Sequence, residues 1–175
     1  MTYYDEIADG YDDLHKEEQE KKLVLIKKLI SPSKNDLLLD VGCGSGISTR
    51  FWDCDRVGID PSQKLIEIAI DKDGKGRYLV GSAESMPFKN CEFDFVISVS
   101  AIHNFKDYVK GLQEMHRVGK GTFVFSVLKK SAKFSQIMQA IMMNFPVQRI
   151  IKQEKDVVFL ATATLSKTKF PELSK

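Results

Sequence analysis

Apolar residues recur along this chain in two alternating patterns, short continuous runs and longer stretches with helical spacing. The short runs predict strands at 37–41, 56–59, 78–80, 93–98 and 122–128. The stretches between them predict helices at 47–52, 62–70 and 107–118. Strands that alternate with helices form a parallel sheet with helices on both faces, so the pattern predicts an α/β fold.

Two further helices are predicted outside this alternation. The first, at 16–30, places Leu23, Ile26 and Leu29 on one face and stops at a Ser-Pro-Ser sequence. The second, at 131–143, carries an apolar stripe that is expected to face the core. The first helix is expected to lead into the domain, and the second to face its core.

The chain is expected to finish in an antiparallel hairpin. The apolar runs VQRIIK at 147–152 and DVVFLATA at 156–163 are separated by only three residues. A connection this short cannot cross over between parallel strands, but it can turn between antiparallel ones.

Composition narrows the class of protein. A chain of 175 residues fits one domain. Its 26 Lys and Arg nearly balance its 24 Asp and Glu, and the basic residues are spread along the chain except near Lys129 and Lys130. This even charge distribution argues against a nucleic-acid partner. Cys43, Cys54 and Cys91 form no CxxC pair, so neither a disulfide framework nor a metal site is expected. No apolar run approaches the ~20 residues that span a bilayer, and a cytoplasmic protein is expected.

A glycine-rich loop directly after the first predicted strand carries the strongest chemical signal. The segment LLLDVGCGSG at 37–46 offers free backbone N–H groups to a ligand. Asp40, however, would repel a pyrophosphate and suits an ammonium group. Asp60 follows twenty residues later, at the end of the second predicted strand, where its carboxylate can accept from both hydroxyls of a ribose. The implied ligand is a nucleoside with a cationic tail and no phosphate.

Four ordered segments resemble class I S-adenosylmethionine-dependent methyltransferases, in the small-molecule branch that includes the ubiquinone and menaquinone biosynthesis methyltransferases. They read LLLDVGCGSG, VGIDPSQKLIEIA, GSAESMPFKNCEFDFVISVSAIHNF and EMHRVGKGTFVFS, and YYDEIADGYDD resembles the family's N-terminal segment. The resemblance covers residues 3–163. It implies a Rossmann-like, doubly wound, seven-stranded, mostly parallel sheet with an antiparallel last strand, and S-adenosylmethionine as the cofactor.

The resemblance also implies which residues bind this cofactor. Asp60 would bind the ribose, Pro61 would lie against the adenine, and Ser98 would face the sulfonium. The residues expected around the methionine portion are Tyr11, Asp40, Gly42, Cys43, Gly44 and Gly46, and those along the adenine edge are Ser82, Ala83 and Glu84. Each acid has an ordinary alternative, because Asp40 can cap a helix and Asp60 before a proline can form a turn.

One position departs from the family pattern, and two others each have two possible roles. The family usually has an aspartate at Ser82, so adenine recognition is expected to rest on the Ala83 backbone and Glu84. His103 follows the fourth predicted strand, where a neutral imidazole could take a proton from the methyl acceptor, or the residue could be structural. Tyr11 could equally be an ordinary residue of the first helix.

The expected function is in-line methyl transfer to a small-molecule acceptor whose identity the sequence does not predict. Alternatives are a methyltransferase-like cofactor-binding module without turnover, or a methyltransferase acting on protein, RNA or lipid. An oxidoreductase is disfavoured by Asp40, and SVSAIHNF in place of an NPPY-type segment argues against methylation of exocyclic DNA amines. No oligomeric state is predicted.

Three regions are expected along the chain. Residues 1–30 form an N-terminal helical lid, 31–165 the S-adenosylmethionine-binding methyltransferase domain, and 166–175 a polar tail. The later connections are too short to cover an acceptor pocket, so the lid with its tyrosines is expected to do so.

Overall fold

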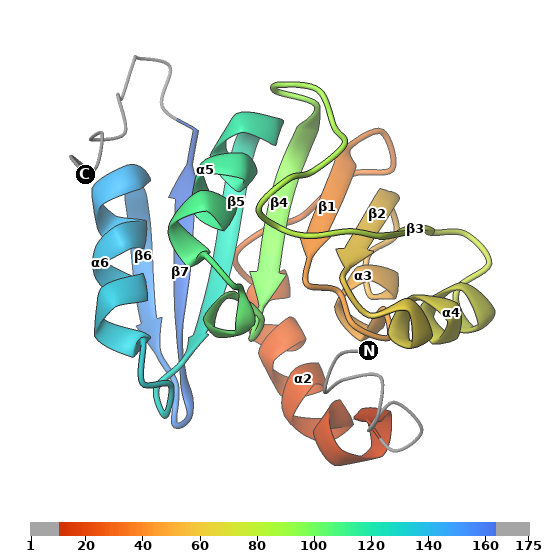
Figure 1. Ribbon diagram of the computed structural model, residues 1–175, viewed down its shortest axis with the longest axis horizontal. Helices are drawn as coiled ribbons and strands as arrows, with labels where there is room; N and C mark the ends of the chain where they lie inside the picture. Colours follow the sequence, from red (N-terminus) through yellow and green to blue (C-terminus); the bar gives the residue numbers. More distant parts are fainter. Residues whose placement is uncertain (1–10, 164–175) are drawn as a thin grey trace.

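The computed structural model describes the backbone of residues 11–163 and the side chains of residues 19–163 (Figure 1). The predicted polar tail, the first ten residues of the predicted lid and the side chain of Tyr11 lie outside the described residues. Within them, helices and strands alternate as expected. In chain order the elements are α2 (Tyr11–Lys27), β1 (Leu37–Val41), α3 (Ile47–Arg50), β2 (Asp55–Asp60), α4 (Gln63–Lys72), β3 (Arg77–Val80), β4 (Phe93–Val99), η2 (Ile102–Asn104), α5 (Tyr108–Val118), β5 (Gly119–Leu128), α6 (Phe134–Asn144), β6 (Val147–Lys152) and β7 (Asp156–Thr162).

The seven strands form one sheet in the order β3-β2-β1-β4-β5-β7-β6. Strands β1 to β5 pair in parallel, whereas β7 runs antiparallel to both neighbours, with Phe125 of β5 opposite Phe159. The short turn between β6 and β7 forces this reversal. The predicted doubly wound sheet with an antiparallel last strand is confirmed.

Helices cover both faces of the sheet, and each face has its own apolar core. In Figure 1, α5 and α6 lie in front of the sheet, and their core includes Leu112 and Ile141. The opposite core contains Leu23 and Ile26 of α2 together with Trp52. Successive residues of β5 point into opposite cores, so Phe123, Val124 and Phe125 are apolar in succession rather than alternating with polar residues.

Strand β5 begins earlier than its apolar run predicts. The structure starts it at Gly119 instead of Thr122, because Gly119 pairs with Phe93 of β4. A side chain at Gly121 would collide with the backbone carbonyl of Asp94. The two glycines therefore let the backbones approach closely, and this contact with β4 outweighs their low strand propensity.

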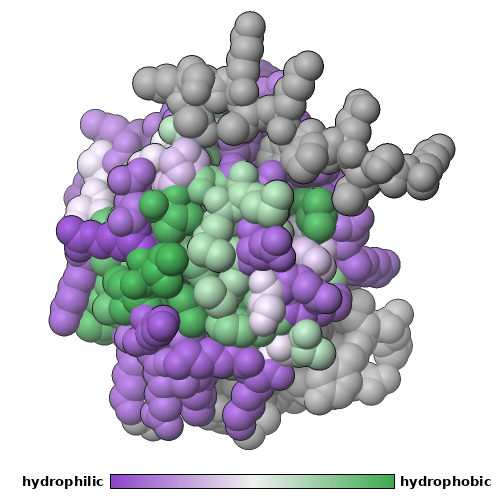
Figure 2. Space-filling view, turned by 90° about the vertical axis from the view of Figure 1, so that its left-hand side faces the viewer, coloured by the Kyte–Doolittle hydropathy of each residue, from purple (hydrophilic) through white to green (hydrophobic). Residues whose placement is uncertain are grey.

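The edge of the sheet at β6 exposes apolar side chains. Figure 2 looks onto this face and shows hydrophobic residues gathered between hydrophilic ones. Met142 and Met143 of α6 and Ile150 of β6 are 48%, 63% and 44% exposed. Neither α6 nor β6 contributes to the cavity described below, so this face is separate from it.

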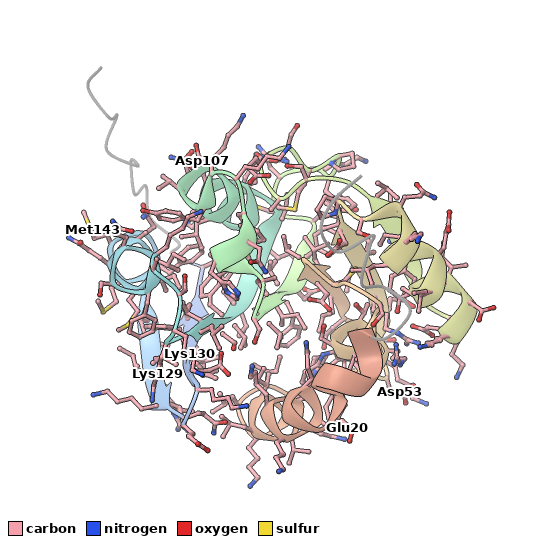
Figure 3. All side chains as sticks on the ribbon, turned by 60° about the horizontal axis from the view of Figure 1, so that its bottom comes forward. Glu20, Asp53, Asp107, Lys129, Lys130 and Met143 are labelled. Atoms are coloured by element: carbon pink, nitrogen blue, oxygen red, sulfur yellow. The ribbon has the colours of Figure 1, made fainter. Side chains whose placement is uncertain are left out.

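The basic pair Lys129 and Lys130 follows β5 (Figure 3). The ammonium group of Lys129 donates to the backbone carbonyls of Gln153 and Glu154 in the turn between β6 and β7. Lys129 therefore ties the end of β5 to this hairpin turn.

Candidate functional site

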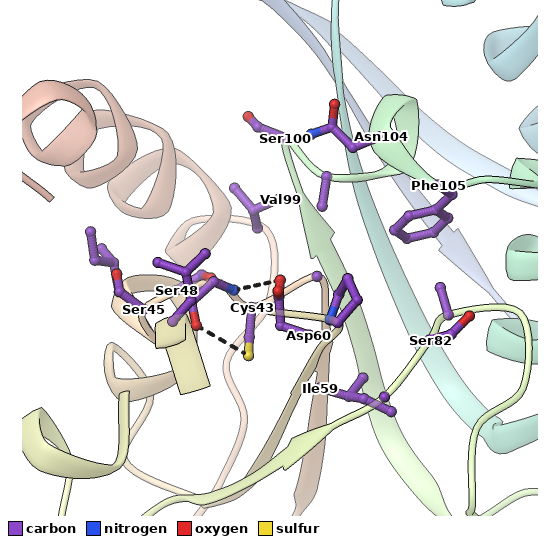
Figure 4. A pocket seen from close by; sticks show the side chains of 18 of the residues that line it. Cys43, Ser45, Ser48, Ile59, Asp60, Ser82, Val99, Ser100, Asn104 and Phe105 are labelled. Carbon is purple, nitrogen blue, oxygen red and sulfur yellow. Dashed lines mark hydrogen bonds between the residues drawn. The ribbon is translucent and has the colours of Figure 1, made fainter. Parts of the chain in front are cut away.

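A cavity of about 450 Å³ lies at the carboxyl ends of β1, β2 and β4 (Figure 4). Strand β1 lies between β2 and β4, so the chain connections diverge at this point of the sheet. Open α/β sheets bind their ligands at such a point, and the volume falls in the roughly 300–1,000 Å³ range of small-molecule sites. The cavity is therefore the candidate site.

The glycine loop after β1 forms one wall. Gly42, Gly44 and Gly46 have φ angles of 76°, 53° and 79°, in the left-handed region that favours glycine. A side chain at Gly42 would also collide with Cβ of Ala101, which follows β4. The glycines thus bring the loop after β1 against the loop after β4. Gly42 and Gly44 line the cavity, whereas Gly46 caps α3 and does not.

Asp60 ends β2 and lies at the cavity wall. Its Oδ2 accepts the Gly44 N–H at 3.0 Å, and its Oδ1 accepts the Ser62 N–H at 2.9 Å. These two bonds fix the orientation of the carboxylate at the cavity wall. Pro61 lines the same wall.

Asp40 is fully buried and lies behind the loop rather than on the cavity surface. Its Oδ2 accepts from the Ser48 and Thr49 hydroxyls at 2.5 and 2.7 Å, whereas its Oδ1 has no partner among the described residues. Burial raises the pKa of Asp40 to about 6 against the effect of the two hydroxyls, and Asp60 adds to the rise. Asp40 therefore changes charge near neutral pH.

The loop after β3 forms the opposite wall, where Ser82, Ala83 and Glu84 all line the cavity. The Ser82 hydroxyl donates to the Glu84 carboxylate, which also accepts the Asp107 N–H at 3.1 Å. Glu84 thus holds this loop against the start of α5.

Two other predicted residues have structural contacts. Ser98 is fully buried, donates to the Val41 carbonyl at 2.8 Å and does not line the cavity. Cys43 does line it, but burial raises the pKa of its thiol well above the usual value. A protonated, enclosed thiol is a weak nucleophile, in keeping with a packing role.

His103 lies on η2 and is not among the residues that line the cavity. Its Nδ1 is buried without a hydrogen-bond partner among the described residues. Burial lowers the pKa of His103, Asp156 opposes this effect, and Lys22 and Lys133 reinforce it. The imidazole is therefore neutral at neutral pH.

Several cavity residues were missed by the sequence interpretation. Ser100, Asn104 and Phe105 follow β4, and Gln19 comes from α2. The end of the fourth predicted strand could have pointed to the first three. No local pattern indicates Gln19, because its position depends on how α2 packs against the sheet.

Within the described part of the chain, no three His, Cys, Asp or Glu residues are grouped so that they could hold a metal ion. In the same part, no helix combines the length and the apolar character needed to cross a bilayer.

Comparison with known proteins shows which family the chain resembles. Residues 39–125, about half of the chain, match the family profile described as a methyltransferase domain. The chain is 30% identical to the demethylmenaquinone methyltransferase of Thermotoga maritima over 132 residues, which are 69% of this chain and 56% of the relative. It is 36% identical to an uncharacterised protein of Methanocaldococcus jannaschii, covering 71% of this chain and 50% of the relative. The chain therefore spans about half the length of these curated relatives.

Solved structures share the fold over most of the chain. A chain from the complex between the Haloferax volcanii Trm112 methyltransferase activator and a methyltransferase superposes with a TM-score of 0.76 at 17% identity, covering 93% of this chain and 98% of that one. A TehB-like S-adenosylmethionine-dependent methyltransferase from Corynebacterium glutamicum gives 0.74 at 16% identity, covering 90% and 98%.

Proposed function

We propose that this chain, which belongs to the class I S-adenosylmethionine-dependent methyltransferases, transfers a methyl group to a small-molecule acceptor. The observation that carries the proposal is the pair of carboxylates, Asp40 and Asp60, beside the loop of left-handed glycines. Two acids at one loop suit a cationic nucleoside and disfavour a pyrophosphate.

The residues present fit this cofactor. Asp60 lines the cavity at the end of β2, where its carboxylate could accept from ribose hydroxyls, and Oδ1 of Asp40, without a partner among the described residues, offers a negative charge behind the glycine loop. Ser82, Ala83, Glu84 and Pro61 line the cavity, and we assign the first three to the adenine edge and Pro61 to the adenine face. Gly42, Cys43, Gly44 and Gly46 would surround the methionine portion, in the proposed assignment. We also propose that Tyr11 and Ser98 contact the methionine portion of the cofactor.

S-adenosylmethionine supplies, when bound, an electrophilic methyl group on a positively charged sulfur. The protein's task is to hold the acceptor in line with that methyl group and to exclude water. We assign His103 as the group that takes the acceptor's proton, because its imidazole is neutral and its Nδ1 has no partner among the described residues. Its side chain does not line the cavity but lies one residue before Asn104, which does, so it would have to turn toward the bound acceptor.

The proposal is tested by calorimetric titration of the full chain with S-adenosylmethionine and with NADH, followed by methyl transfer from labelled cofactor. Binding of S-adenosylmethionine alone and labelling of a small-molecule extract are expected. Tighter binding of NADH would point to an oxidoreductase, and cofactor binding without transfer to any extract would indicate a module without turnover.

An RNA acceptor is the second candidate. The chain is 40% identical to the 18S rRNA (guanine-N(7))-methyltransferase of Mus musculus, but over only 73 residues, or 37% of this chain. Labelled transfer to an RNA fraction and not to the small-molecule fraction would favour this candidate.

A further inference from the structure

A buried ion pair lies behind the cavity wall. Lys22 of α2 and Asp156 at the start of β7 approach to 2.6 Å, and their side chains are 4% and 3% exposed. Removing two charges from water costs about as much as their attraction returns, so such a pair is weak evidence for stability. Its place beside the cavity suggests another role.

Ser100 connects this pair to the cavity. The Lys22 ammonium donates to Ser100 Oγ at 2.5 Å, and Ser100 itself lines the cavity. Its φ angle is 55°, an uncommon backbone conformation for a residue other than glycine. Figure 4 shows Ser100 beside Asn104 at the end of the cavity away from Ser82. The strained backbone thus holds a hydroxyl between the buried ammonium and the cavity.

The hydroxyl proton of Ser100 is available to a ligand. Lys22 can only donate, so it occupies a lone pair of Ser100 Oγ and does not use the Ser100 O–H. The candidate acceptor in the described wall is Ser126 Oγ at 3.4 Å, which is longer than the usual 2.5–3.0 Å of such bonds. Ser126 donates its own proton to Asp156 Oδ1, also at 3.4 Å, and can accept from Ser100 at the same time. A ligand oxygen in the cavity would be the better partner.

The ammonium group of Lys22, which donates to Ser100, favours one kind of ligand atom as the partner of the Ser100 hydroxyl. A hydroxyl that accepts from an ammonium is a stronger donor, and Ser100 accepts from Lys22, whose charge is balanced by Asp156. An anionic oxygen gains from this arrangement. An amine, protonated at neutral pH, has no lone pair to accept the Ser100 O–H.

We propose that Ser100 is a specificity-determining residue that binds an ionised oxygen of the methyl acceptor, and that Lys22 is its positioning residue. The acceptor class is therefore oxygen acids: phenols, enols or carboxylic acids. The inference rests on the proposed function. The acceptor gives its proton to His103, the base assigned above, which later returns it to solvent, and the acceptor's oxygen or conjugated carbon then forms the bond to the methyl carbon. The carbon–sulfur bond breaks with its electron pair going to sulfur.

The acceptor class is tested with a small-molecule extract passed over an anion exchanger at about pH 11, above the usual phenol pKa near 10. Oxygen acids are retained there, whereas neutral amines and alcohols pass through. The full chain with labelled S-adenosylmethionine is expected to label the retained fraction. Label in the unretained fraction, alone or at an equal rate, would overturn the proposal, as would no label in either fraction.

Calorimetry with S-adenosylmethionine distinguishes failure of the proposed function from failure of the proposed acceptor class. Without cofactor binding the proposed function itself fails and the inference falls with it. Binding without transfer to the retained fraction overturns the oxygen-acid class and leaves the cofactor assignment standing.

Ser100→Ala and Ser126→Ala form a matched pair, because each removes one hydroxyl from the same network and only Ser100 lines the cavity. Ser100→Ala is expected to raise the acceptor KM and to lower kcat/KM roughly 30-fold or more, with cofactor affinity unchanged. Ser126→Ala should stay within about threefold of wild type. Equal effects in the two variants would mean that the network is only structural.

The double variant Lys22→Gln with Asp156→Asn removes both charges and keeps hydrogen-bonding groups. It is expected to lower kcat/KM for the retained fraction while the unretained fraction stays inactive. Unchanged kcat/KM in a folded double variant would remove Lys22 from the proposal.

Discussion

Asp60 Oδ2 accepts the Gly44 N–H at 3.0 Å, so the carboxylate that ends β2 holds the glycine loop that follows β1. Its other oxygen accepts the Ser62 N–H ahead of α4. One side chain thus shapes the cavity wall and also faces the space where we place the ribose. Loss of this carboxylate should affect both the loop and the cofactor.

Asp60→Ala is expected to weaken S-adenosylmethionine binding by about 2 kcal/mol or more, because charge-assisted bonds are lost. Asp60→Asn keeps one acceptor oxygen and should fall between the alanine variant and wild type. Calorimetry measures the affinities, with thermal unfolding as the control for folding. Unchanged affinity in a folded alanine variant would remove Asp60 from the site.

Cofactor affinity should depend on pH through Asp40. The pKa of about 6 means that Asp40 is protonated below pH 6 and charged above it in the ligand-free protein. A cationic ligand prefers the charged form, so binding should tighten from pH 5 to 7 and release a proton near pH 6. Calorimetry in buffers of different ionisation enthalpy measures this release. Asp40→Asn should abolish it, and an equal release from that variant would point to another group.

The contribution of Asp40 to the free energy of unfolding should change with pH in the opposite direction to its effect on cofactor affinity. The folded pKa of Asp40 lies above the ordinary value of 3.8, so its protonated form favours the folded state. This contribution is fully present below pH 3.8 and is lost as the pH rises through about 6. Ligand-free Asp40→Asn, which stays neutral, should therefore gain stability over wild type as the pH rises from 4 to 7. Urea unfolding at several pH values checks this, and a constant difference would contradict it.

Gly42→Ala should destabilise the protein by roughly 1–3 kcal/mol, because the new side chain meets Ala101 in a left-handed backbone conformation. Gly74→Ala is the matched control, since nothing lies within 4 Å of the added carbon, and it should change stability by less than about 1 kcal/mol. Denaturant unfolding of both variants gives the comparison. Similar values would mean that the loop relaxes freely.

His103→Ala should lower turnover by about 100-fold and leave cofactor affinity unchanged, as for a general base. The wild-type rate should fall as the pH drops, with a midpoint below the ordinary 6.5, because burial lowers the pKa of His103. His103→Gln keeps a polar side chain of similar size and should be as slow as the alanine variant. Near-normal turnover in both variants would make His103 structural.

Removal of residues 1–14 tests the predicted lid. The truncated chain should fold, because Leu23, Ile26 and Ile30 still pack in the core behind α2. It should lose most of its turnover while thermal stability changes little. Full activity after truncation would refute the lid and turn attention to a second subunit.

Local patterns in the sequence were sufficient for much of the fold. The run Leu37–Val41 is observed as β1 with the same bounds, because an apolar segment before a glycine loop has few other conformations open to it. The three-residue connection before Asp156 required the antiparallel turn. The spacing of Asp40 and Asp60 placed both acids at one end of the sheet, since β1 and β2 pair in parallel with Asp40 opposite Gly58.

The tertiary structure alone decided how the far end of the cavity is built. Lys22 and Ser100 are 78 residues apart in the sequence. They meet only because α2 packs on one face of the sheet, close to the carboxyl end of β4. Periodicity shows which face of a helix is apolar, but not which polar side chain at the edge of that face meets another element. A buried lysine therefore looks like any surface lysine in the sequence, and its contacts with Asp156 of β7 and with Ser100 exist only because α2 packs against the sheet.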